Sequence, residues 1–132
     1  MSLPSHTFNF TKLLVGDLDK SAAFYEAVFG LQRLAVVEDA IAGRAIREVM
    51  YQPTQEGGAT FVILSFLDAP EPVMGETITG FTVADLDQTL SDVMANGGAI
   101  ADPVREMPEM GIRVGFARDP EGHLIEIVQM LG

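Results

Sequence analysis

A short motif occurs twice in the chain. Val15-Gly16-Asp17-Leu18-Asp19 returns as Val83-Ala84-Asp85-Leu86-Asp87, and Gly30 returns as Gly98 at the same offset. Each copy has the signals for a strand end, an acidic turn, a helix and a closing glycine. A unit of about 60 residues buries little apolar surface alone, whereas two related units can share one core and enclose a cleft where they meet. The repeat therefore predicts one pseudo-symmetric domain over residues 1–132, with its functional site at the junction of two modules.

The charge balance limits the possible partners. Among 132 residues there are 8 basic and 19 acidic side chains, for a formal net charge of -11. Such a chain repels phosphate backbones and anionic lipids, so we expect neither nucleic acid nor a membrane surface as a partner. Without a long apolar run or a signal-peptide pattern, a cytoplasmic location is expected. The absence of cysteine excludes disulfides, thiolate metal sites and a cysteine nucleophile.

Local signals predict the same order of elements in both halves. Asp17 to Asp19 supply capping side chains for a helix over 20–29, and Gly30 suits the left-handed residue that closes it. In the first half, the expected strands cover residues 8–15, 31–38, 44–52 and 59–67. In the second half, a helix is expected over 86–95, with strands over 76–83, 99–104, 113–118 and 124–130. The proline-rich and acidic stretch 68–75 predicts an extended linker between module 1 (about 7–67) and module 2 (about 76–131).

Three stretches carry a resemblance to a known superfamily. They are DLDKSAAFYEAVFGL (17–31), DLDQTLSDVMANGGAI (85–100) and FARDPEGHLIEIVQ (116–129). In this order they resemble the vicinal-oxygen-chelate superfamily, which includes glyoxalase I, bleomycin-resistance proteins and extradiol dioxygenases. The resemblance implies an α+β fold of two βαβββ modules that form an open, incomplete β-barrel, often completed in a homodimer, with a ligand cavity inside the curved sheet. Because such a fold hosts many chemistries, the function needs its own argument.

The resemblance also implies positions for metal ligands. Metal-dependent members place four ligands, usually histidine or glutamate, on the inner faces of the strands. In this chain three of the positions fall at Phe10, near Ile63 and at Ile78, whose side chains do not bind metals. The fourth, Glu126, retains a ligand-type carboxylate. Because a divalent site normally needs three or more protein ligands, we expect no family metal and none of the chemistry that depends on it.

Glu126 and Lys12 each allow two interpretations. On a half-buried strand Glu126 acts as a general base or as an anchor for a cationic ligand. Alternatively, it is a retained residue that pairs with Lys12 or an arginine. Lys12 shares a strand face with Phe10 if the alternation is regular, so it either holds an anionic substrate or neutralises Glu126.

Four other polar residues are considered as candidates for the site. His6 either reaches the mouth of the cavity or stays in a solvated terminus. His123 follows the Pro-Glu-Gly turn, where we expect a surface position. For Arg44 and Arg47 we expect pairing with surface acids.

These observations predict a dimeric protein resembling glyoxalases and bleomycin-resistance proteins. We expect it to bind a small, partly apolar organic molecule, without turnover, in a metal-free cavity lined by Phe10, Lys12, Ile63, Ile78 and Glu126. The alternative is a small-molecule lyase or isomerase, either metal-independent with Glu126 as catalytic general base or a divalent-metal enzyme with unrecognised ligands. A third possibility, an interaction module, predicts an apolar surface patch and a filled cavity.

Overall fold

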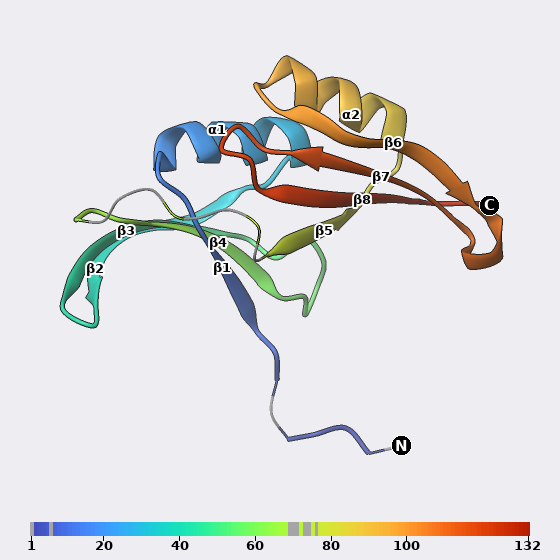
Figure 1. Cartoon of the computed structure of the whole chain (residues 1–132). Coiled ribbons are helices and arrows are strands. Elements are labelled where there is room, and N and C mark those ends of the chain that lie inside the picture. The colour runs from blue at the N-terminus through green and yellow to red at the C-terminus, as the bar shows by residue number, and fades with distance from the viewer. Residues whose placement is uncertain (1, 6, 69–71, 73–74, 76) are drawn as a thin grey trace.

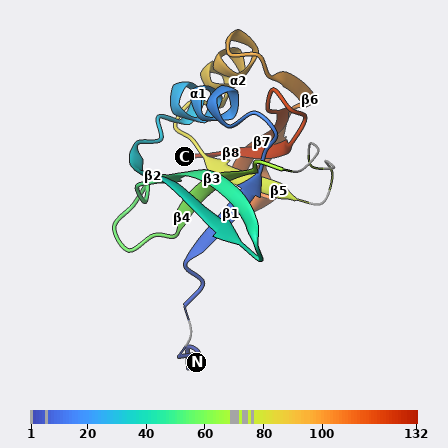
Figure 2. The ribbon, with the colours of Figure 1, turned by 90° about the vertical axis from the view of Figure 1, so that its left-hand side faces the viewer.

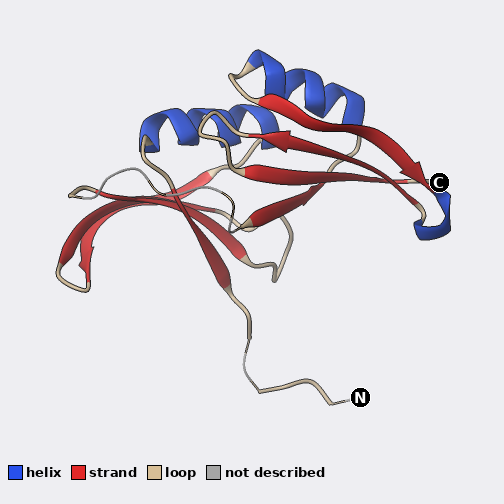
Figure 3. Cartoon of the chain, in the orientation of Figure 1, coloured by secondary structure: helices blue, strands red, loops and turns tan. Residues whose placement is uncertain are grey.

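The order of elements repeats along the chain, as the sequence predicts. The structure, a computed structural model, describes residues 2–5, 7–68, 72, 75 and 77–132. In order, it contains β1 (Phe10–Leu14), α1 (Leu18–Phe29), β2 (Arg33–Ile41), β3 (Arg44–Tyr51), β4 (Thr60–Phe66), β5 (Ile78–Thr82), α2 (Leu86–Ala95), β6 (Ala99–Met107), the 3₁₀ turn η1 (Pro108–Met110), β7 (Ile112–Arg118) and β8 (Leu124–Met130). This confirms the α+β class and the two βαβββ modules (Figure 1, Figure 3). Most of the predicted linker 68–75 lies outside the described residues.

Each helix begins behind a capping aspartate. The Asp17 carboxylate accepts a hydrogen bond from the Lys20 amide at 3.0 Å, and the Asp85 carboxylate accepts one from the Gln88 amide at 3.1 Å. A side-chain cap of this kind stabilises a helix by about 1 kcal/mol, because it pairs one of the free amides of the first turn. Because Asp17 alone supplies the cap, α1 begins at Leu18, two residues before the expected start.

The strands form two separate sheets. Their orders are β1-β4-β3-β2 in module 1 and β5-β8-β7-β6 in module 2. β1 runs parallel to its neighbour β4, and β5 runs parallel to its neighbour β8. The other pairs of neighbouring strands are antiparallel. Within the described residues, β1 pairs with β4 alone and β5 with β8 alone. Each sheet therefore has an edge strand at either end, β1 and β2 in module 1 and β5 and β6 in module 2, and the sheets do not close into a barrel.

The two modules share one apolar core. Both helices lie on the same side of the sheets (Figure 1, Figure 2). Tyr25 of α1 is fully buried, and its ring centroid lies 5.3 Å from that of Phe61 in β4 and 6.4 Å from that of Phe81 in β5. One aromatic side chain thus contacts both sheets, so the junction of the modules is part of the core. None of the helices that the structure describes is long and apolar enough to cross a membrane.

Candidate functional site

A partly buried ion pair lies on the face of the first sheet that points away from α1. Lys12 Nζ is 2.9 Å from Glu48 Oε2, and the two side chains are 31% and 8% exposed. Lys12 therefore contacts Glu48 rather than Glu126. The sequence analysis did not single out Glu48, although Glu48 shares one face of β3 with the apolar residues Ile46 and Met50. An acidic residue on an otherwise apolar strand face indicates a buried polar group, and this pattern could have identified Glu48.

Ile63 does not lie beside Lys12. It is fully buried and belongs to the core cluster, and it pairs in register with Leu13. Since side chains alternate along a strand, the β4 residues on the Lys12 face are Val62 and Leu64. The structure therefore places Ile63 in the core under α1 and not in a cavity on the opposite face.

Glu126 is half-buried and has no partner within the part of the chain that the structure describes. Its neighbours Ile125 and Ile127 are fully buried in the core, so Glu126 points to the other face of the second sheet. In register it stands between Gly80 and Phe116. Around the position of a Gly80 Cβ no atom lies within 4 Å, so the space beside the carboxylate is open on that side. Neither Lys12 nor an arginine pairs with Glu126 in this chain.

A cavity lies between the modules, and we call it the junction pocket. It has a volume of about 950 Å³. One wall is the free edge of β5 and the turn after it, residues 77–85; the others come from the end of α1, the β3–β4 connection and the start of β4. Of the predicted cavity residues, Ile78 is the one that contributes to this lining. Phe10 and Ile78 are 51% and 59% exposed, each on a free strand edge.

The junction pocket has an aromatic floor and a neutral polar lining. The rings of Phe29 and Phe81 are stacked with centroids 3.8 Å apart, and Phe61 stands edge-on to Phe81 at 6.1 Å. Among the described residues that form the lining there is no lysine, arginine or histidine, and the one acid among them, Asp85, caps α2. The lining is also rich in uncharged polar residues: Thr11, Gln52, Thr54, Gln55, Thr60, Thr77, Thr79, Thr82 and Thr89. This lining suits a molecule with an apolar body and neutral or positive polar groups.

One hydroxyl in the pocket wall has no partner. Within the described part of the structure, Thr79 Oγ1 is buried and makes no hydrogen bond. A buried hydroxyl left unpaired costs about 1–3 kcal/mol, so such groups usually have a partner. Because Thr79 also lines the junction pocket, a bound molecule is one source of that partner.

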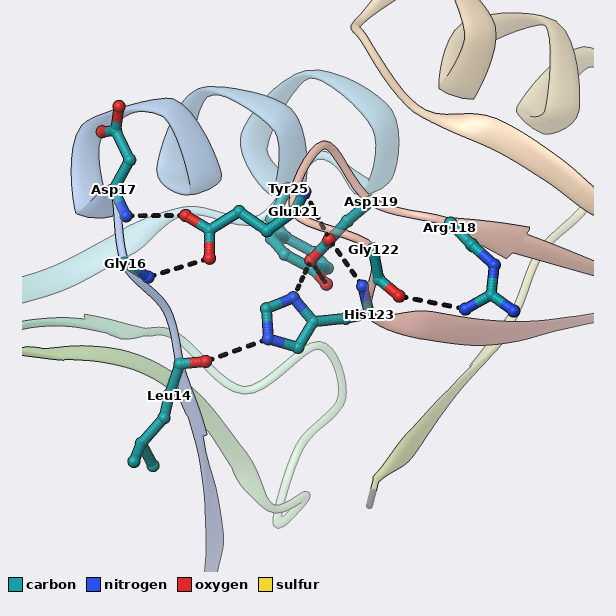
Figure 4. Close-up of polar contacts among 9 residues, drawn as sticks. All are labelled: Leu14, Gly16, Asp17, Tyr25, Arg118, Asp119, Glu121, Gly122 and His123. Carbon is teal, nitrogen blue, oxygen red and sulfur yellow. Dashed lines mark hydrogen bonds and ion pairs between the residues drawn. The ribbon is translucent and has the colours of Figure 1, made fainter. Parts of the chain in front are cut away.

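His123 is not at the surface, and this corrects the expectation from sequence. It is only 6% exposed, because the turn between β7 and β8 folds against the segment between β1 and α1 (Figure 4). There the imidazole contacts Asp119 and the Leu14 carbonyl. The turn that precedes His123 is therefore a contact between the modules.

The arginine prediction is confirmed for both residues. Arg44 pairs with Asp68 and Arg47 with Asp19, each at 3.3 Å between nitrogen and oxygen, and all four side chains are substantially exposed. Exposed pairs of this kind contribute about 0–1 kcal/mol and mark no site. His6 lies outside the described residues.

The chain was compared with known families and structures. The sequence pattern of the Glyoxalase/Bleomycin resistance protein/Dioxygenase superfamily matches residues 7–127. The chain belongs to this superfamily. It is 27% identical to a probable lactoylglutathione lyase from Vibrio parahaemolyticus, over 90% of this chain and 87% of that protein. It is 25% identical to a lactoylglutathione lyase from Haemophilus influenzae, over 90% and 89% of the two chains.

Solved structures support the same fold. A glyoxalase family protein from Bacillus cereus superimposes with a TM-score of 0.83 at 20% identity, covering 99% of this chain and 100% of that one. TioX from Micromonospora sp. ML1 gives a TM-score of 0.65 at 27% identity, covering 96% and 100%. The first of these likenesses shows the fold alone.

The residues at the superfamily's metal positions do not fit a metal. Phe10 and Ile78 have no donor atom, Ile63 is buried in the core, and Glu126 stands alone. Across the residues that the structure describes, no group of three or more histidine, aspartate or glutamate side chains is placed to hold an ion. Glu126 is a single carboxylate, which is too few ligands for a divalent site.

Proposed function

We propose that this superfamily member binds a small, partly apolar, uncharged or cationic organic molecule in the junction pocket, without a metal and without turnover. The supporting observation is the lining itself: stacked aromatic rings below, threonines and glutamines around, and the unpartnered Thr79 hydroxyl in the wall. Ligand pockets commonly have volumes of roughly 300–1,000 Å³ and combine apolar walls with a few polar groups. An open pocket of this size argues against a pure interaction module, for which a filled cavity is expected.

The charge of the lining limits the class of ligand. Lactoylglutathione, the compound that appears in the names of the relatives above, is a peptide thioester with two carboxylates. The described residues of the junction pocket include no cationic side chain to pair with them, and the chain as a whole has a formal charge of -11. Removing a carboxylate from water without a partner is costly. We therefore propose that the ligand differs in charge from lactoylglutathione.

A second candidate is a metal-independent lyase or isomerase that uses Glu126 as general base. It is favoured by one observation: Glu126 is half-buried, unpaired and beside the open space at Gly80. A general base needs a carboxylate free to accept a proton from a bound substrate. This candidate predicts turnover that chelators do not affect and that Glu126→Gln abolishes.

We also propose a homodimer in which a second copy covers the free strand edges. β1 and β5 occupy equivalent places in the repeat, and each exposes an apolar residue, Phe10 and Ile78, at its free edge. Exposed edges of this kind attract another strand, and two equivalent edges allow closure by a twofold axis. A partner β1 beside β5 would bring Phe10 and Lys12 of one copy near Ile78 and Glu126 of the other, and would form a further wall of the junction pocket.

Sedimentation tests this assembly. At micromolar concentration we expect a mass of twice 14.2 kDa. Phe10→Asp places a charge on the free edge of β1 and should shift the protein to monomers, whereas Phe8→Asp, upstream of the strand, should not. A wild-type monomer would contradict the proposal.

Matched probes test the proposed ligand class. Three naphthalene derivatives share one ring system but carry an ammonium, a hydroxyl or a carboxylate group. We expect the ammonium and hydroxyl probes to bind in calorimetric titrations, at least about tenfold more tightly than the carboxylate, because the lining has no cation. EDTA should not change the affinity.

Variants at one lining position locate the binding. Thr82→Trp should fill the junction pocket and weaken binding of the ammonium and hydroxyl probes. Thr82→Val keeps the size of the side chain, so both probes should bind as they do to the wild type. Tightest binding of the carboxylate, or binding unaffected by Thr82→Trp, would contradict the proposal. Conversion of lactoylglutathione by the purified protein would contradict the absence of turnover.

A further inference from the structure

The turn between β7 and β8 is bonded to module 1 by a cluster that we call the module latch. It comprises Asp119, Glu121 and His123 of module 2 with Leu14, Gly16, Asp17 and Tyr25 of module 1 (Figure 4). The Glu121 carboxylate accepts hydrogen bonds from the Gly16 amide at 2.8 Å and the Asp17 amide at 2.6 Å. Tyr25 Oη donates to Asp119 Oδ2 at 2.8 Å. The latch thus joins the modules through side chains rather than through a sheet.

Both ring nitrogens of His123 face acceptors. Nδ1 lies 2.7 Å from Asp119 Oδ2, and Nε2 lies 2.9 Å from the Leu14 carbonyl oxygen. A neutral imidazole carries one N–H and can donate to only one of them. Both hydrogen bonds therefore require the imidazolium form. Deprotonation must release either the bond within the turn or the bond to module 1.

Asp119 is held as a carboxylate. Its Oδ1 accepts the amides of Glu121 and His123, while Oδ2 accepts the Tyr25 hydroxyl and faces the imidazole. A carboxylate has enough lone pairs for these four contacts, and a protonated carboxyl does not accept them all. The side chain is buried, so each lost contact leaves a donor unpaired.

The groups around His123 favour its charged form. They are Asp119 and Glu121 from its own turn, the Leu14 carbonyl from β1 and, through Asp119, the Tyr25 hydroxyl from α1. Burial lowers the pKa of His123, but the hydrogen bond and negative charge of Asp119, with help from Leu14 and Glu121, raise it above 6.5 overall. For Asp119, burial raises the pKa, and the hydrogen bonds from His123 and Tyr25 outweigh it, so the pKa lies below 3.8.

We propose that the module latch is a pH-sensitive switch that sets how firmly the two modules hold each other at the junction. With His123 protonated, the imidazolium bridges Asp119 and the Leu14 carbonyl and ties β1 to the turn. When the proton leaves, the remaining N–H stays on Nδ1 beside the Asp119 carboxylate, which is the stronger acceptor, and the Leu14 carbonyl of module 1 loses its donor. The modules then hold each other less firmly at the turn between β7 and β8. This inference does not depend on which molecule the pocket binds.

The direction of the pH effect follows from the two shifts. Because the pKa of His123 is raised on folding, its contribution is complete below the unfolded value of 6.5 and is lost as the pH rises through the folded value. Because the pKa of Asp119 is lowered, its contribution is present above 3.8 and is lost as the pH falls through the folded value. The latch should therefore be strongest between about pH 4 and pH 6.5.

Nuclear magnetic resonance measures the switch directly. The chain has two histidines, so His123→Gln assigns the second imidazole by elimination. Imidazole shifts recorded from pH 5 to pH 9 should place the His123 titration above 6.5, with both ring nitrogens protonated at pH 6. Through the same titration, amide protection factors in residues 14–17 should fall at least about threefold in the wild type, as local opening becomes easier.

Two outcomes would overturn the proposal. One is a His123 titration at or below 6.5, which the wild type alone can reveal even if the variant does not fold. The other is an equal pH dependence of protection in the wild type and in folded His123→Gln, which would show that the imidazole does not control the junction. A matched variant, Glu121→Gln, removes one charge near His123 but keeps an acceptor for an amide of module 1, and should retain the pH step.

Discussion

Asp119→Ala is expected to lower the free energy of unfolding by about 3–5 kcal/mol, because it removes one partner of a buried charged pair. Asp119 is 3% exposed and accepts four contacts, from Tyr25, Glu121 and His123. Alanine leaves the Tyr25 hydroxyl and two amides without acceptors in a buried place, and leaves the imidazole without its counter-ion. Urea unfolding at pH 6, where both partners are charged in the wild type, measures the effect.

Controls separate the buried contacts from the loss of a surface charge. Asp102→Ala changes an exposed position of β6, and we expect a change within about 0.5 kcal/mol. Asp119→Asn keeps an oxygen acceptor but loses the charge, so its effect should lie between the two. A loss of less than about 1 kcal/mol for Asp119→Ala would mean that the turn contributes little to holding the modules together.

Gly98→Ala is expected to destabilise the protein by about 1–3 kcal/mol through overpacking. A Cβ built at Gly98 lies 2.6 Å from the Arg118 carbonyl oxygen, 2.6 Å from Val93 Cγ1 and 3.0 Å from Phe24 Cε1. One of these neighbours is backbone in β7 and another belongs to α1 of the other module. The clash can be relieved only by moving elements that pack in the shared core.

A second glycine gives the matched control. Gly80 lies within β5, and no atom lies within 4 Å of a Cβ built there. Gly80→Ala should therefore leave the thermal unfolding temperature almost unchanged, whereas Gly98→Ala should lower it by several degrees. Equal effects of the two substitutions would show that the close approach at Gly98 does not determine the cost.

The repeat predicted the fold because it carried local signals that the structure uses. Asp17 and Asp85 cap the two helices in the same way. The repeat was less accurate at the helix ends. Gly30 has a φ of 66° and closes α1 as expected, but α2 is two residues shorter, so the left-handed residue there is Gly97, with a φ of 89°. Gly98 does not have a positive φ, and glycine is required there because a Cβ would have no space.

The site was harder to predict, because its contacts join residues far apart in the sequence. The resemblance places a ligand position near Ile63, and alternation alone cannot correct this in a strand that is apolar on both faces, where Val62 and Leu64 share the face of Lys12. His123 follows a turn, which normally indicates exposure, but that turn is buried against β1. The junction pocket depends on how the modules pack, which no local pattern contains.

We propose a binding pocket that works without the divalent metal of the superfamily. The most direct test is elemental analysis of the purified, untagged protein by mass spectrometry, before and after incubation with zinc, nickel, manganese or iron(II) and desalting. We expect well below one ion per chain under every condition, because Glu126 is a single carboxylate without neighbouring ligands. One retained ion per chain that is lost in Glu126→Gln would contradict the claim and favour metal-dependent catalysis.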